Sequence, residues 1–206
     1  MIDLQSFRLT VAKVLAALGI AHVPMLMVIC TLLGRDIVGN TVACASLALV
    51  PIALLYAKRS ITTVAFGIAI ALIGQTSLLV LAFSGHPWQV EMHFYYFAVL
   101  AMLSGFCDWH VLALAAGLVS LHHLSLNFIL PNAVYPGGSN ALRVGVHATI
   151  VVIEVAMLIF IGQTIRGAFR AAGDARRRAE EVVAELERIG SERNKTSSQP
   201  INALPP

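Results

Sequence analysis

The sequence predicts an all-α protein, a six-helix transmembrane bundle followed by a cytoplasmic coiled-coil extension at the C-terminus. Hydrophobic residues make up 58% and charged residues 12% of the 206 residues, whereas soluble domains carry about 25% charged residues. The mean hydropathy is +0.80. Six stretches have the roughly 20 apolar residues that a membrane-spanning helix needs. Beyond the last stretch, apolar residues recur every three or four positions among charged ones, which is typical of a coiled coil.

The six apolar stretches are separated by short polar breaks that contain turn-forming or charged residues. Gly34-Arg35-Asp36, Lys58-Arg59-Ser60 and Ser84-Gly85-His86-Pro87 are three of these breaks, and such clusters end helices. The predicted spans are residues 12–33, 41–57, 61–83, 90–107, 110–130 and 143–165. They place the transmembrane domain at residues 1–166, an exit helix at 167–190 and a polar tail, expected to be disordered, at 191–206.

The distribution of Lys and Arg predicts the orientation of the spans. One side of the six spans carries Arg8, Lys13, Lys58, Arg59, Arg166 and Arg170, and the other side carries Arg35 and Arg143. Because Lys and Arg accumulate on the cytoplasmic side, both termini are predicted to be cytoplasmic. The net charge of +3 lies in short loops and the tail, so it suggests contact with the headgroups of a lipid bilayer and no nucleic-acid partner.

Ionisable residues lie in or beside the apolar stretches, where each charged one costs roughly 2.5–3.5 kcal/mol on insertion scales. Five histidines and two glutamates share this property, and together they form the predicted cofactor or metal site: His22, His93, His122, His123, His147, Glu91 and Glu154. Imidazole is a common ligand of haem and of transition metals. Haem b between two histidines, or a copper or zinc ion, are therefore the expected cofactors. The absence of a CxxCH motif excludes covalent c-type haem. The alternative is that these side chains join helices by hydrogen bonds.

The exit helix carries a regular apolar seam with spacings of four and three. Its members are Ile161, Ile165, Ala168, Ala172, Ala175, Ala179, Val182, Leu186 and Ile189. A strict heptad seam favours a parallel homodimer. A single amphipathic helix lying on the membrane surface is the alternative, favoured by the arginines around the seam.

Several of these segments resemble a known family. They are Glu91-Met92-His93-Phe94, Cys107-Asp108-Trp109-His110, the stretch from Leu121 through His122-His123 to Asn127-Phe128, and Arg143 to Ala148 with Glu154; His22-Val23-Pro24 fits as well. They are similar to the membrane-embedded N-terminal sensor region of bacterial methyl-accepting chemotaxis proteins, over about residues 10–190.

The resemblance implies a bacterial inner-membrane sensor domain and a signalling helix that leads to a cytoplasmic coiled coil or a separate cytoplasmic signalling protein. The family's long methyl-accepting hairpin is missing from the sequence, so an excised or truncated input module is one expectation. A small membrane cytochrome or transporter that uses the same His and Glu groups as an electron or proton path is the alternative function. No HExxH, GxSxG or P-loop pattern appears, so the sequence does not predict an enzyme.

Overall fold

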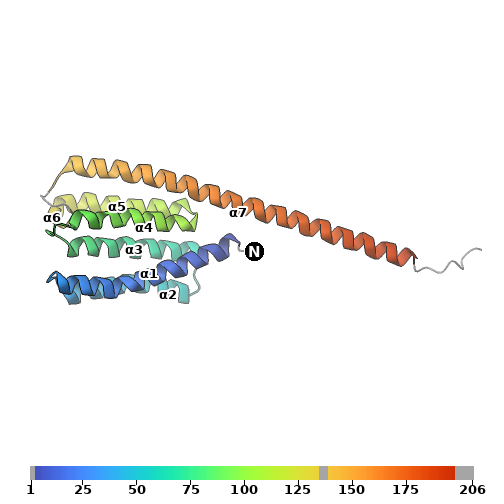
Figure 1. Cartoon of the computed structure of the whole chain (residues 1–206), viewed down its shortest axis with the longest axis horizontal. Coiled ribbons are helices and arrows are strands. Elements are labelled where there is room, and N and C mark those ends of the chain that lie inside the picture. Colours follow the sequence, from blue (N-terminus) through green and yellow to red (C-terminus); the bar gives the residue numbers. More distant parts are fainter. Residues whose placement is uncertain (1–2, 135–138, 198–206) are drawn as a thin grey trace, which may run out of the picture. The chain divides into compact units, whose positions relative to one another are not determined.

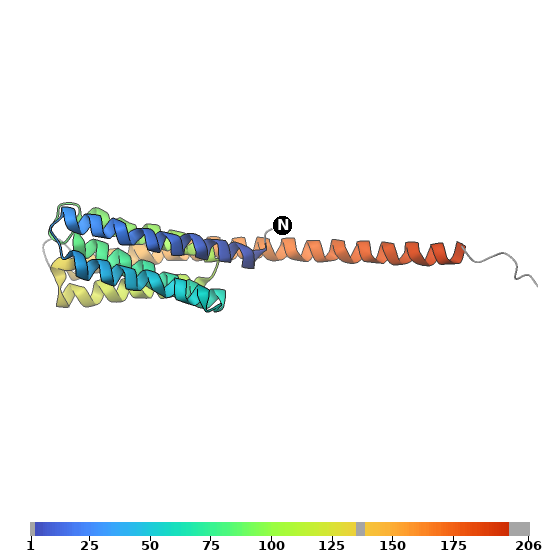
Figure 2. The same ribbon diagram turned by 90° about the horizontal axis from the view of Figure 1, so that it is seen from below.

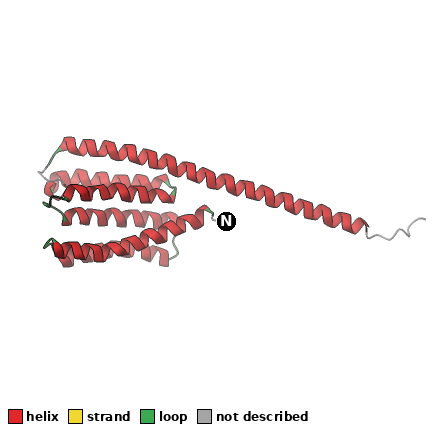
Figure 3. Cartoon of the chain, in the orientation of Figure 1, coloured by secondary structure: helices red, strands yellow, loops and turns green. Residues whose placement is uncertain are grey.

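The computed structural model describes residues 3–134 and 139–197, and within these residues every regular element is helical (Figure 3). The all-α prediction is therefore confirmed. The elements follow the chain in this order: α1 (Leu4–Leu32), α2 (Ile37–Tyr56), α3 (Ile61–Ala82), α4 (Gln89–Leu103), the 3-10 turn η1 (Ser104–Phe106), α5 (Trp109–Ile129), α6 (Pro131–Val134) and α7 (Ala141–Ser197).

Five of these helices are long and apolar enough to cross a membrane, judged by length and composition: α1, α2, α3, α5 and α7. The fourth predicted span is shorter than expected. Its helix, α4, has 15 residues and is followed by the three-residue turn η1. At the other extreme, α7 continues to Ser197, so residues 191–197 are helical where the sequence predicted disorder. The rest of the predicted tail, residues 198–206, lies outside the described residues.

Side-chain caps mark where several helices begin after a polar residue. Asp36, Ser60 and Asp108 each precede a helix and accept a hydrogen bond from a backbone N–H in its first turn. Such caps satisfy amide groups that have no partner inside the helix. Gly34, with φ of +62°, follows the last turn of α1, in a conformation that glycine adopts without strain. These local signals explain why the breaks in the apolar pattern became turns.

Helix α3 lies at the centre of the first unit and packs against α1, α2, α4 and α5 (Figures 1 and 2). Most of its apolar side chains, among them Ile68 and Leu72, are buried, and a helix that is mostly buried needs no polar face. Gly67 and Gly74 face the side chains of Leu54 and Leu47 on α2, so small residues allow these two helices to approach closely. A buried hydrophobic cluster connects α1, α3, α4 and α5 with Val151 and Val155 of α7.

The chain divides into two compact units, Met1–Arg166 and Gly167–Pro206. In the second unit, the side chains of residues 170–194 are exposed. Ion pairs one turn apart line this helix, for example Arg176 with Glu180 at 2.6 Å and Arg188 with Glu192 at 2.7 Å. Exposed pairs of this kind support a solvated helix only weakly.

Candidate functional site: a histidine cluster on three helices

Four of the predicted histidines come together in the first unit. His93 is supplied by α4, His122 and His123 by α5, and His147 by α7. The ring centroids of His93 and His123 are 5.6 Å apart, those of His123 and His147 are 5.1 Å apart, and those of His93 and His147 are 6.2 Å apart. The imidazoles of three helices therefore form one cluster, which we call the histidine cluster (His93, His122, His123 and His147).

Hydrogen bonds to the backbone define the tautomers of two cluster members. Nδ1 of His93 lies 2.8 Å from the carbonyl oxygen of Gln89, and Nδ1 of His123 lies 2.8 Å from that of Val119. A carbonyl oxygen only accepts hydrogen bonds, so Nδ1 carries the hydrogen in both neutral rings. Nε2 then bears the lone pair. This is the arrangement in which histidine ligands of metals are commonly held.

His147 joins the cluster from α7 through ring contacts. Its imidazole is stacked on that of His123 with 20° between the ring planes, and it also contacts the ring of Phe97. Nε2 of His147 is buried and has no hydrogen-bond partner among the described residues, and the same is true of Oε2 of Glu154, two turns further along α7. Buried polar atoms without a partner cost about 1–3 kcal/mol each, so these two atoms mark α7 as a place where a partner is missing.

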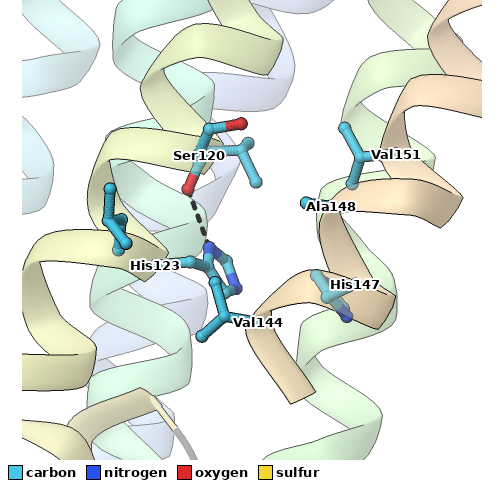
Figure 4. Close-up of a pocket in the computed structure, with 8 residues that line it drawn as sticks. Ser120, His123, Val144, His147, Ala148 and Val151 are labelled. Atoms are coloured by element: carbon cyan, nitrogen blue, oxygen red, sulfur yellow. Dashed lines mark hydrogen bonds between the residues drawn. The ribbon is translucent and has the colours of Figure 1, made fainter. Parts of the chain in front are cut away.

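A cavity of about 190 Å³ lies between α5 and α7 beside the cluster (Figure 4). Its wall is largely apolar. The residues that line it are Val119, Ser120, His123, Leu124, Val144, His147, Ala148 and Val151. Figure 4 shows the side chain of His123 facing α7 across this space, with the hydrogen bond from its Nδ1 drawn as a dashed line.

The two adjacent histidines of α5 have different surroundings, as expected for neighbours about 100° apart on a helix. His123 is 3% exposed and lies between His93 and His147. His122 is half-buried and contacts the ring of Tyr96 at a centroid distance of 6.0 Å. One turn further, Asn127 donates to the hydroxyl of Ser139 and accepts from the backbone N–H of Asn140. Asn127 thereby ties α5 to the start of α7.

His22 takes part in a separate hydrogen-bond network that joins four helices. The amide nitrogen of Gln75 donates to the carbonyl oxygens of Gly19 and Cys44, at 2.9 and 3.1 Å. Its Oε1 therefore accepts from Nδ1 of His22 at 2.9 Å. Nε2 of His22 then accepts from the hydroxyl of Tyr95 at 2.6 Å. Every polar atom of this imidazole has a partner, so His22 holds α1 against α3 and α4 and is not placed as a ligand of the cluster.

The remaining ionisable residues lie apart from the cluster. Glu91 is exposed on the first turn of α4. Among the described residues, no group of three or more His, Cys, Asp or Glu side chains is arranged to hold a metal ion. Pockets for drug-sized ligands measure about 300–1,000 Å³, and a haem macrocycle is at least as large as such ligands. Haem therefore does not fit the 190 Å³ cavity beside the cluster.

Sequence reasoning missed the residues that support the histidines. Gln75 interrupts the apolar run 61–83, and that interruption was the available signal for a buried polar partner of His22. Tyr96 is fully buried, and its hydroxyl forms a hydrogen bond with that of Ser77 at 2.9 Å. No sequence signal separates Tyr96 from its exposed neighbour Phe94 except its position three residues after His93.

Comparison with protein-family models, with characterised proteins and with solved structures gives no significant match. The interpretation of the histidine cluster therefore depends on its geometry.

Proposed function

We propose that the chain is a membrane-embedded signal-input module of the chemoreceptor type, located in the bacterial inner membrane. Five long apolar helices support insertion in a bilayer. Large apolar side chains on the outer faces of the helices are exposed, as lipid contact requires; they include Val14, Val28, Leu49, Phe128, Val152 and Phe160. In this proposal α4, extended by η1, makes a sixth crossing, so that both termini are cytoplasmic.

The observation that carries the proposal is the position of His147. It belongs to the histidine cluster, and it also belongs to α7, the helix that continues to Ser197. A change at the cluster therefore acts directly on the helix that contains the predicted seam. Helix α7 packs against the other helices through few close backbone approaches, whereas α3 packs against α1, α2, α4 and α5. A loosely packed helix that carries one wall of a binding site is suited to a change of state.

The proposed cofactor is a copper or zinc ion held by Nε2 of His93 and of His123. Both atoms carry the lone pair, as argued above. An ion bound at about 2.0–2.1 Å from each nitrogen would place the two ring centroids about 5–6 Å apart, and the observed separation is 5.6 Å. Two protein ligands leave coordination positions open. Such open positions are typical of sites where an exchangeable ligand binds.

Metal analysis of the purified protein tests this part of the proposal. We expect about one copper or zinc per chain, and a loss of at least tenfold in metal affinity in His93→Gln and His123→Gln. His86→Gln and His110→Gln are the matched controls, because these histidines lie in loops or beside them and outside the cluster. A metal-free wild-type protein, prepared from cells with ample copper and zinc, would refute the cofactor.

Signal output is proposed to pass through a parallel homodimer of the seam. Val182, Leu186 and Ile189 are 59%, 63% and 49% exposed in the single chain, which leaves their side chains available for a second copy. Cysteine placed at Val182 should form a disulfide-linked dimer in membranes, and cysteine at Glu181, beside the seam, should do so much less. The native cysteines Cys30, Cys44 and Cys107 are buried and contribute little background. Equal crosslinking at both positions would contradict a seam-specific dimer.

The signalling step itself is tested with the same crosslink. Addition of the bound metal should change the rate of crosslinking at Val182→Cys, and His123→Gln should abolish that change. A rate that does not respond to the metal, in protein that binds it, would separate metal binding from signalling.

A further inference from the structure

The cavity between α5 and α7 has the size and the chemistry of a binding site for one small ring. Its volume is about 190 Å³, and a dry apolar cavity of about 150 Å³ in another protein binds benzene. Val119, Val144 and Val151 supply apolar wall. A single aromatic ring with one or two small substituents therefore matches this space, whereas a larger cofactor does not.

One polar atom beside the cavity requires a hydrogen-bond partner. Nε2 of His147 is buried and has no partner among the described residues, although His147 lines the cavity. A ligand hydroxyl can donate to an imidazole nitrogen or accept from an imidazole N–H, so it satisfies His147 in either tautomer. A ligand carbonyl satisfies only one of them. Ser120 adds a hydroxyl to the cavity wall, which can bind a second oxygen on the ring.

The rim of the cavity is apolar and faces outward. Leu124, which lines the cavity, is 54% exposed, and its neighbours Leu121 and Phe128 on the same helix are 64% and 71% exposed. A molecule dissolved among lipid chains meets this rim before it meets any charged group. Access from the bilayer is therefore favoured over access from water.

From these three features we infer that the cavity binds a hydroxylated aromatic ring, a phenol or the reduced head group of a quinol, with its hydroxyl bonded to His147. The inference goes beyond the proposed function, because it concerns the cavity and does not require an ion at the cluster. It assigns a ligand to the cavity that α7 lines on one side. The proposed function assigns signal output to the same helix.

The test compares two ligands of nearly equal size on the full chain in lipid nanodiscs, treated with EDTA to remove metal. Binding of 4-methylphenol and of toluene is measured by equilibrium dialysis, with empty nanodiscs as the reference for partitioning. We expect saturable binding of both, with 4-methylphenol bound about fivefold more tightly, because one net hydrogen bond is worth about 1 kcal/mol. Absence of saturable binding, or equal affinity for the two rings, would overturn the inference.

Two variants connect this preference to the cavity. His147→Leu should retain toluene binding and lose the preference for the phenol. Ala148→Phe should abolish binding of both, because its side chain is itself the size of the ligand, while Ala156→Phe, on an exposed position of α7 away from the cavity, should leave binding unchanged. Equal effects of Ala148→Phe and Ala156→Phe would show that the rings bind elsewhere.

Two hydroquinones, one with a decyl chain and one without it, distinguish entry of the ligand from the bilayer from entry from water. If the ligand enters from the bilayer, the hydroquinone with the decyl chain should bind at least tenfold more tightly than the one without it, after correction for partitioning in empty nanodiscs. Equal affinity would overturn access from the bilayer. Since the protein is free of metal throughout, failure here leaves the metal analysis of the proposed function unaffected, and failure of the metal analysis leaves this measurement intact.

Discussion

The guanidinium of Arg8 donates to the carboxylate of Asp108 at 2.6 Å, and both side chains are about 90% buried. The pair joins the first turns of α1 to the N-cap of α5, a hundred positions apart in the sequence. Asp108 also accepts from the backbone N–H and from Nδ1 of His110. One carboxylate thus caps a helix and neutralises a buried cation.

Loss of either partner of this pair should destabilise the protein. Removing one member of a buried ion pair costs about 3–5 kcal/mol, because the other charge is left without compensation. We expect Arg8→Met and Asp108→Asn each to lower the free energy of unfolding by about 3 kcal/mol, and the double variant to lose clearly less than the sum. Thermal and denaturant unfolding in detergent measures this. Lys13→Met, at an exposed position of the same helix, is the control, and additive single effects would show that the two charges are not coupled.

The same pair predicts an acid-sensitive component of stability. Burial raises the pKa of Asp108, but the hydrogen bonds from His110 and Arg8 outweigh it, so the pKa lies below its ordinary value of 3.8. A carboxyl whose pKa is lower in the folded state stabilises the fold above its unfolded pKa, and this contribution is lost as the pH falls through the folded pKa. The difference in unfolding free energy between wild type and Asp108→Asn should therefore be constant above about pH 5 and shrink below about pH 4. A difference that grows on acidification would contradict the lowered pKa.

The network around His22 should matter for stability and not for metal binding. Tyr95→Phe removes the donor to Nε2 of His22 and should cost about 1–2 kcal/mol of unfolding free energy, because a buried acceptor is left without a partner. Tyr56→Phe is the matched control, since Tyr56 is 91% exposed. Metal content should be unchanged in both variants. A loss of metal in Tyr95→Phe would instead place His22 within the functional site.

Position 162 of α7 should tolerate a small side chain but not a large one. A Cβ at this buried position would lie 3.5 Å from Cα of Cys107 and 3.8 Å from the carbonyl oxygen of Ser104, which is ordinary contact. Gly162→Ala should therefore be neutral or stabilise by up to about 1 kcal/mol through helix propensity. Gly162→Leu has no room against this backbone and should destabilise by about 1–3 kcal/mol. Gly145→Leu, with nothing within 4 Å, is the control for size alone in an unfolding measurement.

The sequence predicted the long helices well because hydropathy and capping residues are local signals. Asp36 and Ser60 cap the helices that follow them, and each lies in a break that was visible without a structure. The end of α4 was harder. Ser104 and Gly105 sit within an apolar run, and the segment where the chain turns lies against Val11 of α1 and Gly162 of α7, which are contacts that the local sequence does not reveal.

The sequence alone did not show that His22 lies outside the histidine cluster. Depth along a helix follows from counting residues at about 1.5 Å each. The direction in which a side chain points depends on how helices are rotated against their neighbours, which counting does not give. His22 faces Gln75 and Tyr95, whereas His93 faces His123, and this difference arises from packing around α3 and α4.

The shortness of α4 has a consequence for the surrounding bilayer in the proposed membrane arrangement. At 1.5 Å per residue, α1 with 29 residues is about 43 Å long and α4 with 15 residues is about 22 Å long, against a hydrocarbon core of about 30 Å. The three residues of η1, at about 2 Å each, lengthen the crossing to about 28 Å, which is still slightly shorter than that core. The bilayer would have to thin slightly on that side of the protein, which would make the thickness of the host membrane a physical variable that acts on this end of the bundle.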